Sequence, residues 1–397
     1  MKLAQRTGWI APSATMAMDT RAKEMARQGI DVISFGVGEP DFDTPENVKD
    51  AAIKAIQAGK TKYTPASGVH DLKVAIQAKL ARDQGLHYDV SEIIVTVGAK
   101  HALYGITQVL LDPGDEVIVP APYWVSYVEQ VKVTGAVPVV LETTEATGFR
   151  ITAEQLKKAI TPRTKAIMLN SPSNPTGAVY SREHLEAIAQ VAVDAGVVVV
   201  SDEIYEPFIY EGAKHTSIAE ISPAMKELTL IVNGVSKSHA MTGWRIGFVA
   251  GNREVIKAID SLQSHSTSNP TSIAQWAAIE ALTGPQEPVH AMVQEFAKRR
   301  RYLVDRLRSI PGIECAMPEG AFYVFPKVSA AFGKRYKGKV IASSYDLCEV
   351  LLEEGHVSLV PGSAFGSEGY VRISYATSMA NLEKGMDRFE RIWSALE

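Results

Sequence analysis

The stretch IVNGVSKSHAMTGWRIGFVAG, residues 231–251, decides how the rest of the chain is interpreted. Its apolar beginning predicts a buried strand that ends in a polar, glycine-containing segment carrying Lys237. Arg245 follows eight residues later and opens a second predicted strand. A lysine amine must lose its proton to attack a carbonyl, and burial or a nearby cation favours that state. The pair therefore suits imine formation with a phosphorylated aldehyde, although a solvated surface pair explains the spacing alone more often.

The overall composition is that of an ordinary globular protein. The 397 residues are enough for two domains, or for one large domain with an appendage. Hydrophobic residues make up 46% and charged residues 22% of the chain. The net charge of −4 creates no field that would favour nucleic acid or an anionic membrane. Neither nucleic acid nor a membrane is therefore expected as a partner.

Local features support the same expectation. The basic run at 298–301 is interleaved with apolar residues, which predicts a helix with a solvated charged face rather than a nucleic-acid stripe. Cys315 and Cys348 fit no metal or redox spacing and indicate a reducing compartment. The amino terminus lacks an uninterrupted apolar signal region, and no run approaches the length that spans a bilayer. A cytoplasmic location is expected.

Strand-like and helical patterns alternate through the middle of the chain. This alternation predicts a largely parallel sheet of seven strands, covered by helices on both faces. After about residue 285 the pattern changes to a long amphipathic helix followed by short strands and two more helices. We therefore expect a large domain over 45–285 and a smaller α+β domain formed by 1–44 with 286–397. The seven predicted strands are 93–97, 116–120, 137–141, 166–170, 197–201, 228–232 and 246–250.

The large domain is expected to begin with a helix near residue 45. Thr44 stands where a hydroxyl could cap this helix, and Pro45 falls in its first turn. The apolar spacing predicts that Val48, Ala52, Ile53 and Ile56 form its inner face.

Unusual residues gather where the predicted strands end, which is where open parallel sheets bind ligands. Gly98, Ala99 and Lys100 follow the first strand and open a helix, a pattern typical of an anion site. Trp124 follows the second strand and could stack on a flat ring, or could simply pack in the core.

Three further strands end in polar residues. The rigid loop SPSNPTG, 171–177, presents the amide of Asn174, although a plain turn would explain the motif in isolation. Asp202 directly follows a run of valines and serine, with Tyr205 three residues later. A carboxylate in that place is costly without a partner, and a protonated ring nitrogen, Mg²⁺ or a helix amino terminus could each provide one. Lys237 follows the sixth strand.

Common motifs of other kinds of active site are absent from the sequence. No GxGxxG follows the first strand, and neither GxxxxGK[ST] nor HExxH occurs, so no metal is expected. The remaining set is a phosphate site, an imine-forming lysine, a carboxylate, a phenol, an amide and a stacking aromatic ring. These are the groups that pyridoxal phosphate requires of a protein.

With these residues in view, the sequence resembles the class I aminotransferases of pyridoxal phosphate fold type I, and within them the bacterial aspartate aminotransferase branch, subgroup Ib. GVSKSHAMTGWRIG at 234–247 is similar to the lysine signature of that family. The resemblance implies a large α/β domain with a mostly parallel sheet, a smaller α+β domain and a ping-pong reaction. Further motifs in family order are GVGEPDFDTP at 36, KYTPASG at 62, PYWVSY at 122, SDEIYE at 201 and YVRISYA at 370.

Carried over residue by residue, the resemblance implies specific roles. Lys237 would hold the cofactor as an imine and move the proton, while Asp202 would keep the ring nitrogen charged. Tyr205 and Asn174 would bind the ring oxygen. Other expected cofactor contacts are Trp124 against the ring, Gly98, Ala99, Lys100, Ser236 and Arg245 around the phosphate, and Tyr63 from the neighbouring subunit of a homodimer.

The substrates implied by the resemblance are small amino acids and 2-oxo acids. Arg372 would clamp the α-carboxylate, with the Gly38 backbone closing over it and Trp124 and Asn174 nearby. Lys100, Ser13 and Thr15 are the candidates for a distal carboxylate, as in L-aspartate or glutamate. Ala11 stands where relatives that accept prephenate tend to carry a basic residue, which argues against that substrate.

Other activities on the same scaffold stay open at this point. The residues that hold the cofactor do not fix the reaction, so an aromatic, branched-chain or prephenate aminotransferase or a β-lyase remains possible. A non-catalytic cofactor-binding regulator is disfavoured, because Arg372 is intact and no DNA-binding module is expected before residue 45.

Overall fold

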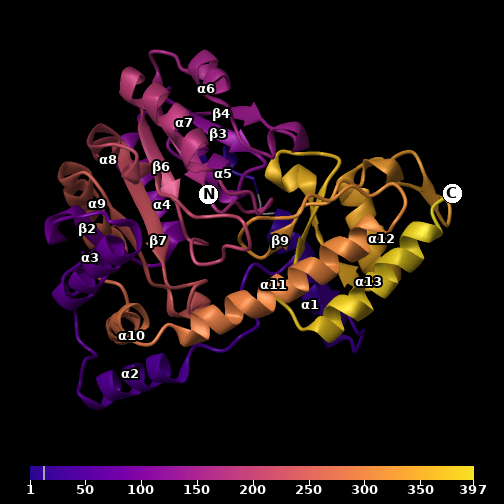
Figure 1. The fold of residues 1–397 in the computed structure, drawn as a ribbon, viewed down its shortest axis with the longest axis horizontal. Coiled ribbons are helices and arrows are strands. Elements are labelled where there is room, and N and C mark those ends of the chain that lie inside the picture. The colour runs from indigo at the N-terminus through magenta and orange to yellow at the C-terminus, as the bar shows by residue number, and fades with distance from the viewer. Residues whose placement is uncertain (12–13) are drawn as a thin grey trace.

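The computed structural model describes residues 1–11 and 14–397, except for the side chains of residues 14–17. Two bodies lie side by side (Figure 1). One is built around a large sheet, and the other around α11 (Glu287–Arg308), α12 (Ser344–Gly355) and α13 (Met379–Ser394). None of the described helices combines the length and the apolar character needed to cross a membrane.

The larger body contains a seven-stranded sheet with the order β2-β8-β7-β6-β5-β3-β4. Neighbouring strands are parallel except for β8, which runs antiparallel to both β2 and β7. The predicted α/β fold with a mostly parallel sheet is thus confirmed. Because β8 runs the other way, its beginning lies at the edge where β7 ends. The strands are β2 (Ile93–Thr96), β3 (Glu116–Ala121), β4 (Val137–Glu142), β5 (Thr164–Asn170), β6 (Val198–Asp202), β7 (Thr229–Gly234) and β8 (Gly247–Ala250).

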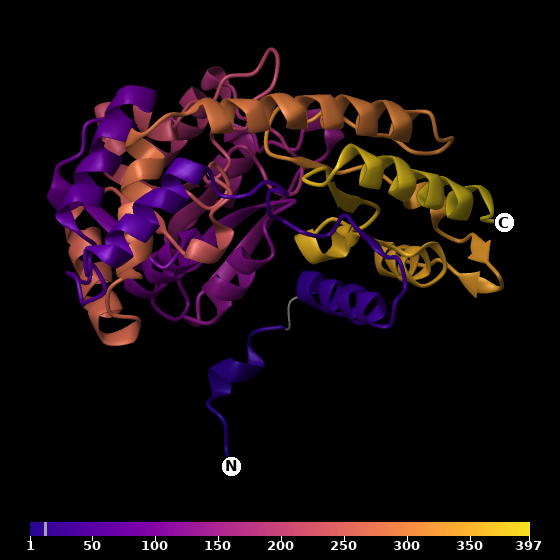
Figure 2. The same ribbon diagram turned by 90° about the horizontal axis from the view of Figure 1, so that it is seen from below.

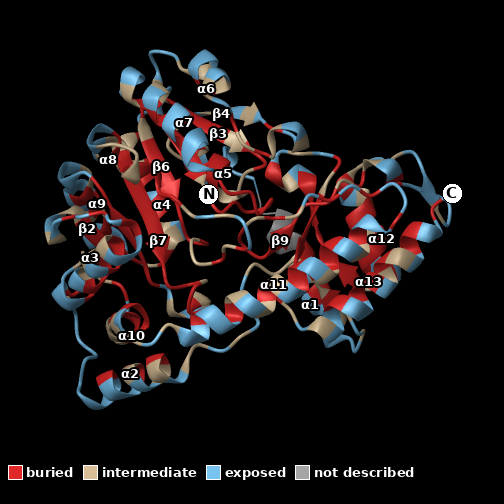
Figure 3. Cartoon of the chain, viewed as in Figure 1, coloured by how far each residue is buried: buried red, intermediate tan, exposed pale blue. Residues whose placement is uncertain are grey.

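Both faces of this sheet are buried under helices (Figure 3). Successive strand residues point to opposite faces, so Val200 packs in one layer and Val199 in the other. One layer contains α4 (Ala99–Leu110), α5 (Ser126–Lys132) and α9 (Arg253–Ser266). The other contains α2 (Glu46–Gln57), α3 (His70–Gln84), α6 (Ala153–Ala159), α7 (Arg182–Ala195), α8 (Pro223–Leu228) and α10 (Ser272–Thr283).

The smaller body joins the two ends of the chain (Figure 2). Strand β1 (Ile33–Ser34) pairs in parallel with β12 (Val357–Ser358), and Met18, Ala22 and Phe35 pack into the same core as the carboxyl-terminal elements. We therefore propose the division expected from the sequence, with 1–44 joining 286–397. The other elements are α1 (Ala14–Arg27), α11 (Glu287–Arg308), β9 (Tyr323–Val324), β10 (Arg335–Tyr336), β11 (Lys339–Val340), α12 (Ser344–Gly355), β13 (Val360–Pro361), β14 (Val371–Ser374) and α13 (Met379–Ser394).

The start of α2 differs from the prediction in two ways. Thr44 does not cap the helix, because its hydroxyl donates to the Ala240 carbonyl at 2.8 Å and accepts from the Trp244 indole at 3.0 Å. Ile53 and Ile56 do not face inward either, since they are 51% and 52% exposed. The buried face of α2 consists of Val48, Ala52 and Ala55.

The basic run on α11 is only half solvated. Arg299 and Arg300 are buried, against the expectation of a solvated face, whereas Lys298 and Arg301 do face solvent. Arg299 pairs with Asp41 at 2.7 Å, and Arg300 donates to the Pro318 carbonyl at 2.7 Å. Periodicity alone did not predict these partners because they come from distant segments of the chain.

Candidate active site

A cavity of about 560 Å³ lies where β5, β6 and β7 end and the smaller body meets the sheet. Residues at the strand ends form one side of it, and Gly38, Tyr323 and Arg372 reach it from the smaller body. Most of the predicted site residues line this cavity: Gly38, Ala99, Lys100, Trp124, Asn174, Asp202, Tyr205, Ser236, Lys237, Arg245 and Arg372.

Lys237 projects into the cavity from the segment that follows β7. Its Nζ donates to the Gly38 carbonyl oxygen, which links the two bodies. Desolvation lowers the pKa of Lys237 to about 8, and the guanidinium groups of Arg372 and Arg245 act in the same direction. The neutral amine that nucleophilic attack requires is therefore much more accessible than in a free lysine.

Asp202 is the last residue of β6 and is only 5% exposed. Its Oδ2 accepts from the Tyr127 hydroxyl at 2.6 Å, and its Oδ1 accepts from the Ile204 amide at 3.2 Å. Burial nevertheless raises the pKa of Asp202 to about 6, because both of these partners are uncharged. A cation in the cavity would stabilise the ionised carboxylate.

Two phenols meet in the wall of the cavity. The Tyr205 and Tyr323 hydroxyls lie 2.8 Å apart, and the Asn174 amide donates to Tyr205 at 3.4 Å. Burial raises the pKa of Tyr205 well above its ordinary value, so this hydroxyl keeps its proton and can donate it in a hydrogen bond.

Arg372 on β14 is a buried guanidinium whose hydrogen-bond partners are neutral. Its Nη1 donates to the Asn174 side-chain oxygen at 2.9 Å and its Nη2 to the Gly36 carbonyl at 2.6 Å. Its plane lies over the Tyr323 ring at 4.5 Å, while its buried Nε has no partner among the described residues. A planar fork in this state is suited to bind a carboxylate.

An anion could be bound at the other end of the cavity, at the amino terminus of α4. The first amides of a helix have no partner within the helix and favour negative charge. Gly98 precedes this helix with φ +81°, and a Cβ at that position would collide with the Arg245 guanidinium. Arg245 is held by the Thr242 carbonyl at 2.8 Å, while Ser236 lines the same cavity.

An aromatic wall completes the cavity. The Lys100 ammonium lies 4.8 Å from the centre of the Trp124 ring, and burial and the Arg245 charge lower the pKa of Lys100. Trp124 packs edge-to-face against Tyr127 at 5.4 Å. One flat face and one cation are therefore presented to a ligand by neighbouring side chains.

Some of the predicted residues lie elsewhere. Tyr63 is 91% exposed and does not line the cavity, so its assignment to the site of a neighbouring subunit stays a prediction. Gly98 supports the cavity from behind Arg245 without lining it. Ser13 lies outside the described residues, as does the side chain of Thr15.

Tyr127 and Tyr323 are among the lining residues that the sequence did not predict. Tyr127 holds Asp202 from the first turn of α5, and Trp124 lies just before that helix, so the cluster of aromatic residues at 123–127 was the local signal for it. Tyr323 stands in the apolar run 321–325, where it resembles an ordinary core residue. Its contact with Tyr205 spans 118 residues, so no local pattern could predict it.

Comparison with known proteins identifies a family to which the sequence is similar. The family model for aminotransferase class I and II matches residues 30–389. An aspartate aminotransferase from Geobacillus stearothermophilus is 56% identical over 100% of both chains. A probable aspartate/prephenate aminotransferase from Rickettsia bellii is 49% identical over 98% of both chains.

The same relationship holds for the fold. The crystal structure of an aspartate aminotransferase from Rhizobium meliloti superposes with a TM-score of 0.97 at 45% identity, covering 100% of both chains. The similarity extends over the full length of the chain, and the cavity contains both Lys237 and the buried Arg372. The chain belongs to the aminotransferase class I and II family.

Proposed function

We propose that this aminotransferase depends on pyridoxal 5′-phosphate and moves the amino group between L-aspartate or glutamate and a 2-oxo acid such as 2-oxoglutarate. The observation that carries the proposal is that one cavity contains two groups with shifted pKa values, an amine and a carboxylate. There, Lys237 has a pKa lowered to about 8, and Asp202 is buried with its pKa raised to about 6.

The residues around the cavity fit this cofactor. Asp202 provides a carboxylate that still needs a cation, which the protonated ring nitrogen would supply. The amino end of α4 and Arg245 provide an anion site, and Trp124 provides a face for stacking. When bound, the cofactor supplies an electron sink for the charge that develops on the substrate Cα.

Each side chain around the cofactor would then have its own role in the reaction. Lys237 Nζ would hold the cofactor and would act as the base that takes the proton from the substrate Cα. Asp202 would stay ionised and keep the ring nitrogen positive. The Tyr205 hydroxyl, with the Asn174 amide beside it, would donate to the ring oxygen. The loss of the charge at Asp202 is expected to cost ~3 kcal/mol of transition-state stabilisation.

Arg372 would bind the substrate α-carboxylate through two parallel N–H groups. The Tyr323 ring lies under Arg372, and Gly38 lies against the Tyr323 hydroxyl. Substrate binding would draw the smaller body against the sheet and exclude water. Lys100 lines the cavity and is a candidate for binding a distal carboxylate, with Ser13 and Thr15 as further candidates. The preference for aspartate is supported by the relatives that bear this name.

We also propose a homodimer in which each site is completed by the neighbouring subunit. Support comes from Tyr63, Ile53 and Ile56, which are apolar or aromatic and more than half exposed on the larger body. The two cysteines are unpaired and buried, which fits the reducing environment of the cytoplasm.

A half-reaction tests the proposal. The reconstituted protein is mixed with single amino acids, and the loss of the cofactor's visible absorption is followed. Aspartate and glutamate should bleach the band, and borohydride reduction should leave the pyridoxyl group on Lys237. Faster bleaching by aromatic or branched-chain amino acids, amino transfer to prephenate, or release of ammonia would indicate one of the other activities. No bleaching by any amino acid would indicate a regulator.

A further inference from the structure

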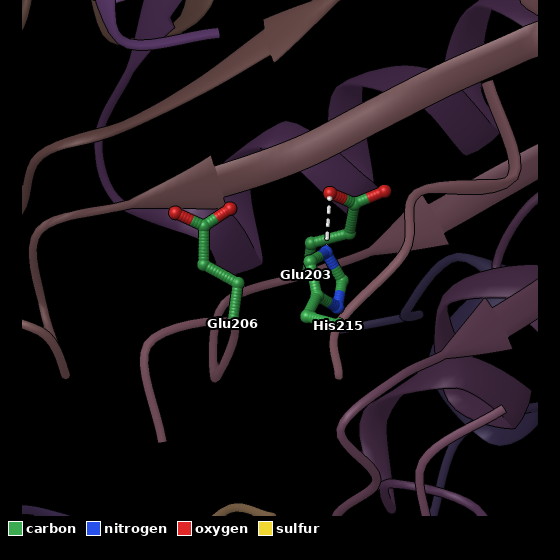
Figure 4. A group of neighbouring side chains, drawn as sticks. All are labelled: Glu203, Glu206 and His215. Atoms are coloured by element: carbon green, nitrogen blue, oxygen red, sulfur yellow. Dashed lines mark hydrogen bonds and ion pairs between the residues drawn. The ribbon is translucent and has the colours of Figure 1, made fainter. Parts of the chain in front are cut away.

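The segment 202–206 has two chemically different faces. Asp202 and Tyr205 line the cavity, whereas Glu203 and Glu206 point away from it toward α3. Figure 4 shows these two glutamates beside His215, with a hydrogen bond between Glu203 and the histidine ring. A buried carboxylate at Glu203 and a partly buried one at Glu206, each next to a proposed catalytic residue, are costly unless they have partners.

Glu203 is almost completely buried and accepts hydrogen bonds from several donors. The Ser201 and Ser217 hydroxyls lie at 2.9 and 2.6 Å, and the Gln84 amide lies at 2.6 Å. The His215 Nε2 lies at 3.2 Å. These donors come from β6, from α3 and from the loop before α8, so one carboxylate ties three segments together.

Glu206 is held in a similar way. The Lys79 ammonium contacts its Oε1, and the Asn233 and Gln84 amides lie 2.9 and 3.1 Å from its Oε2. Lys79 comes from α3 and Asn233 from β7, the strand that leads to Lys237. The back of the segment is thus attached to the elements that flank it on both sides.

The glutamates and the histidine include the donor types of a metal site, and their ligand atoms all lie within 4.8 Å of one another. A lysine ammonium already contacts one of the carboxylates, however, and a divalent cation would have to displace it. Burial opposes both charges, but the hydrogen bond between the two groups outweighs it, lowering the pKa of Glu203 and raising that of His215. The two carboxylates thus already have Lys79 and His215 as partners, in the places that a metal would take.

We propose that Glu203 and Glu206 are positioning residues, which hold the 202–206 segment from behind so that Asp202 and Tyr205 keep their places against the cofactor. This inference rests on the proposed function. Removing one carboxylate leaves several buried donors unpaired, and the segment must shift to satisfy them. A shift of about 1 Å at the adjacent Asp202 is enough to impair catalysis and cofactor binding.

The test compares Glu203→Gln with Glu116→Gln in the holoenzyme. Glu116 is also buried and accepts from the Thr161 hydroxyl at 2.6 Å and the Arg163 Nε at 2.9 Å, but it lies at the start of β3, away from the cavity. Both variants should lose thermal stability. Only Glu203→Gln should release the cofactor roughly tenfold faster and shift the pH titration of its visible band by about half a unit or more.

Three results would contradict the proposal. The first is a Glu203→Gln holoenzyme with unchanged cofactor release and titration. The second is a control that changes them equally. The third is one tightly bound zinc ion per chain after incubation with zinc alone, which would make the cluster a metal site. If Glu203→Gln does not fold, Ser201→Ala removes one donor to the same carboxylate and should give a smaller shift in the same direction.

The proposed function can fail separately. A wild-type protein that binds no cofactor at Lys237 would overturn the proposed function and this inference together. A wild-type protein that binds the cofactor normally, with variants that do not differ from it, would overturn this inference alone.

Discussion

Asp202 is a carboxylate held at a distance from water by uncharged neighbours. Its pKa is raised from 3.8 to about 6, chiefly by burial, so the folded protein holds this proton more tightly than the unfolded chain does. The resulting stabilisation is complete below the unfolded pKa and is lost as the pH rises through about 6. Above that pH, the ionised group is a cost, which a cation bound in the cavity would offset.

We therefore predict that Asp202→Asn makes the cofactor-free protein more stable at neutral pH. The neutral amide avoids the burial of a charge, so the gain in unfolding free energy should grow from about pH 5 to about pH 8 and reach at most ~3 kcal/mol. Urea unfolding of both proteins at the two pH values measures it. An equal gain in unfolding free energy at the two pH values would contradict the raised pKa of Asp202. The same variant should bind pyridoxal phosphate more weakly.

Tyr323 contacts both Arg372 and Tyr205. Its hydroxyl lies 2.8 Å from that of Tyr205, and its ring lies under Arg372. Tyr323→Phe removes one neutral hydrogen bond, so kcat/KM for aspartate should fall about threefold to tenfold. The pKa of the cofactor's visible band should also rise, because Tyr205 becomes a weaker donor to the ring oxygen.

The matched control is Tyr375→Phe. Tyr375 is equally buried, donates to the Ala321 carbonyl at 3.1 Å and does not line the cavity. The Tyr375→Phe variant should lose as much unfolding free energy as Tyr323→Phe, while its kcat/KM and its visible spectrum stay those of the wild type. Identical kinetic effects in both variants would show that Tyr323 acts only through stability.

Among the elements, α11 illustrates how one helix can present the same residue type to two environments. Arg300 is buried, with its guanidinium over the Tyr210 ring at 4.4 Å, while the adjacent Arg301 faces solvent and contacts Glu211. Adjacent residues on a helix point about 100° apart, so a basic run must divide between the buried and exposed faces.

We predict that Arg300→Ala lowers the unfolding free energy by ~2 kcal/mol or more, because the Pro318 carbonyl and the Tyr210 ring lose their buried partner. Arg301→Ala removes an exposed ion pair and should change it by less than ~0.5 kcal/mol. Chemical denaturation of the two variants makes the comparison. A similar loss in both would mean that the run is solvated throughout, as its pattern suggests.

For the whole molecule, the outward-facing isoleucines of α2 identify the face on which a second copy is expected. Ile53 and Ile56 are 51% and 52% exposed, and Tyr63 follows shortly after the helix. Contiguous exposed apolar side chains on a folded protein commonly mark an interface.

We predict that Ile53→Glu combined with Ile56→Glu converts a dimer into monomers, because each substitution would place a charge in an apolar contact. Sedimentation velocity at micromolar concentration measures the change. Val340→Glu is the control, since Val340 is 40% exposed on β11 of the smaller body. If the double variant sediments at the same rate as a dimeric wild-type protein, the interface lies elsewhere.

Local chemistry in the sequence determined the strands and most of the candidate site. β-Branched runs bounded by polar residues predicted all seven strands of the large sheet, because side-chain alternation and burial are properties of neighbouring residues. Asn174, Asp202 and Lys237 each follow or end a predicted strand, and ligands bind at strand ends in such sheets. The sequence therefore predicted that these three residues share a site, and all three line the one cavity.

Contacts between distant segments could be decided only by the tertiary structure. Arg372 and Asn174 are 198 residues apart in the chain and form a hydrogen bond, and Tyr323 reaches Tyr205 over 118 residues. The same holds for the buried state of Arg300 and the exposure of Ile53, since the helical repeat gives the angle between faces but not which face is covered. Burial depends on what packs against a side chain, and those atoms belong to elements that are remote in the sequence.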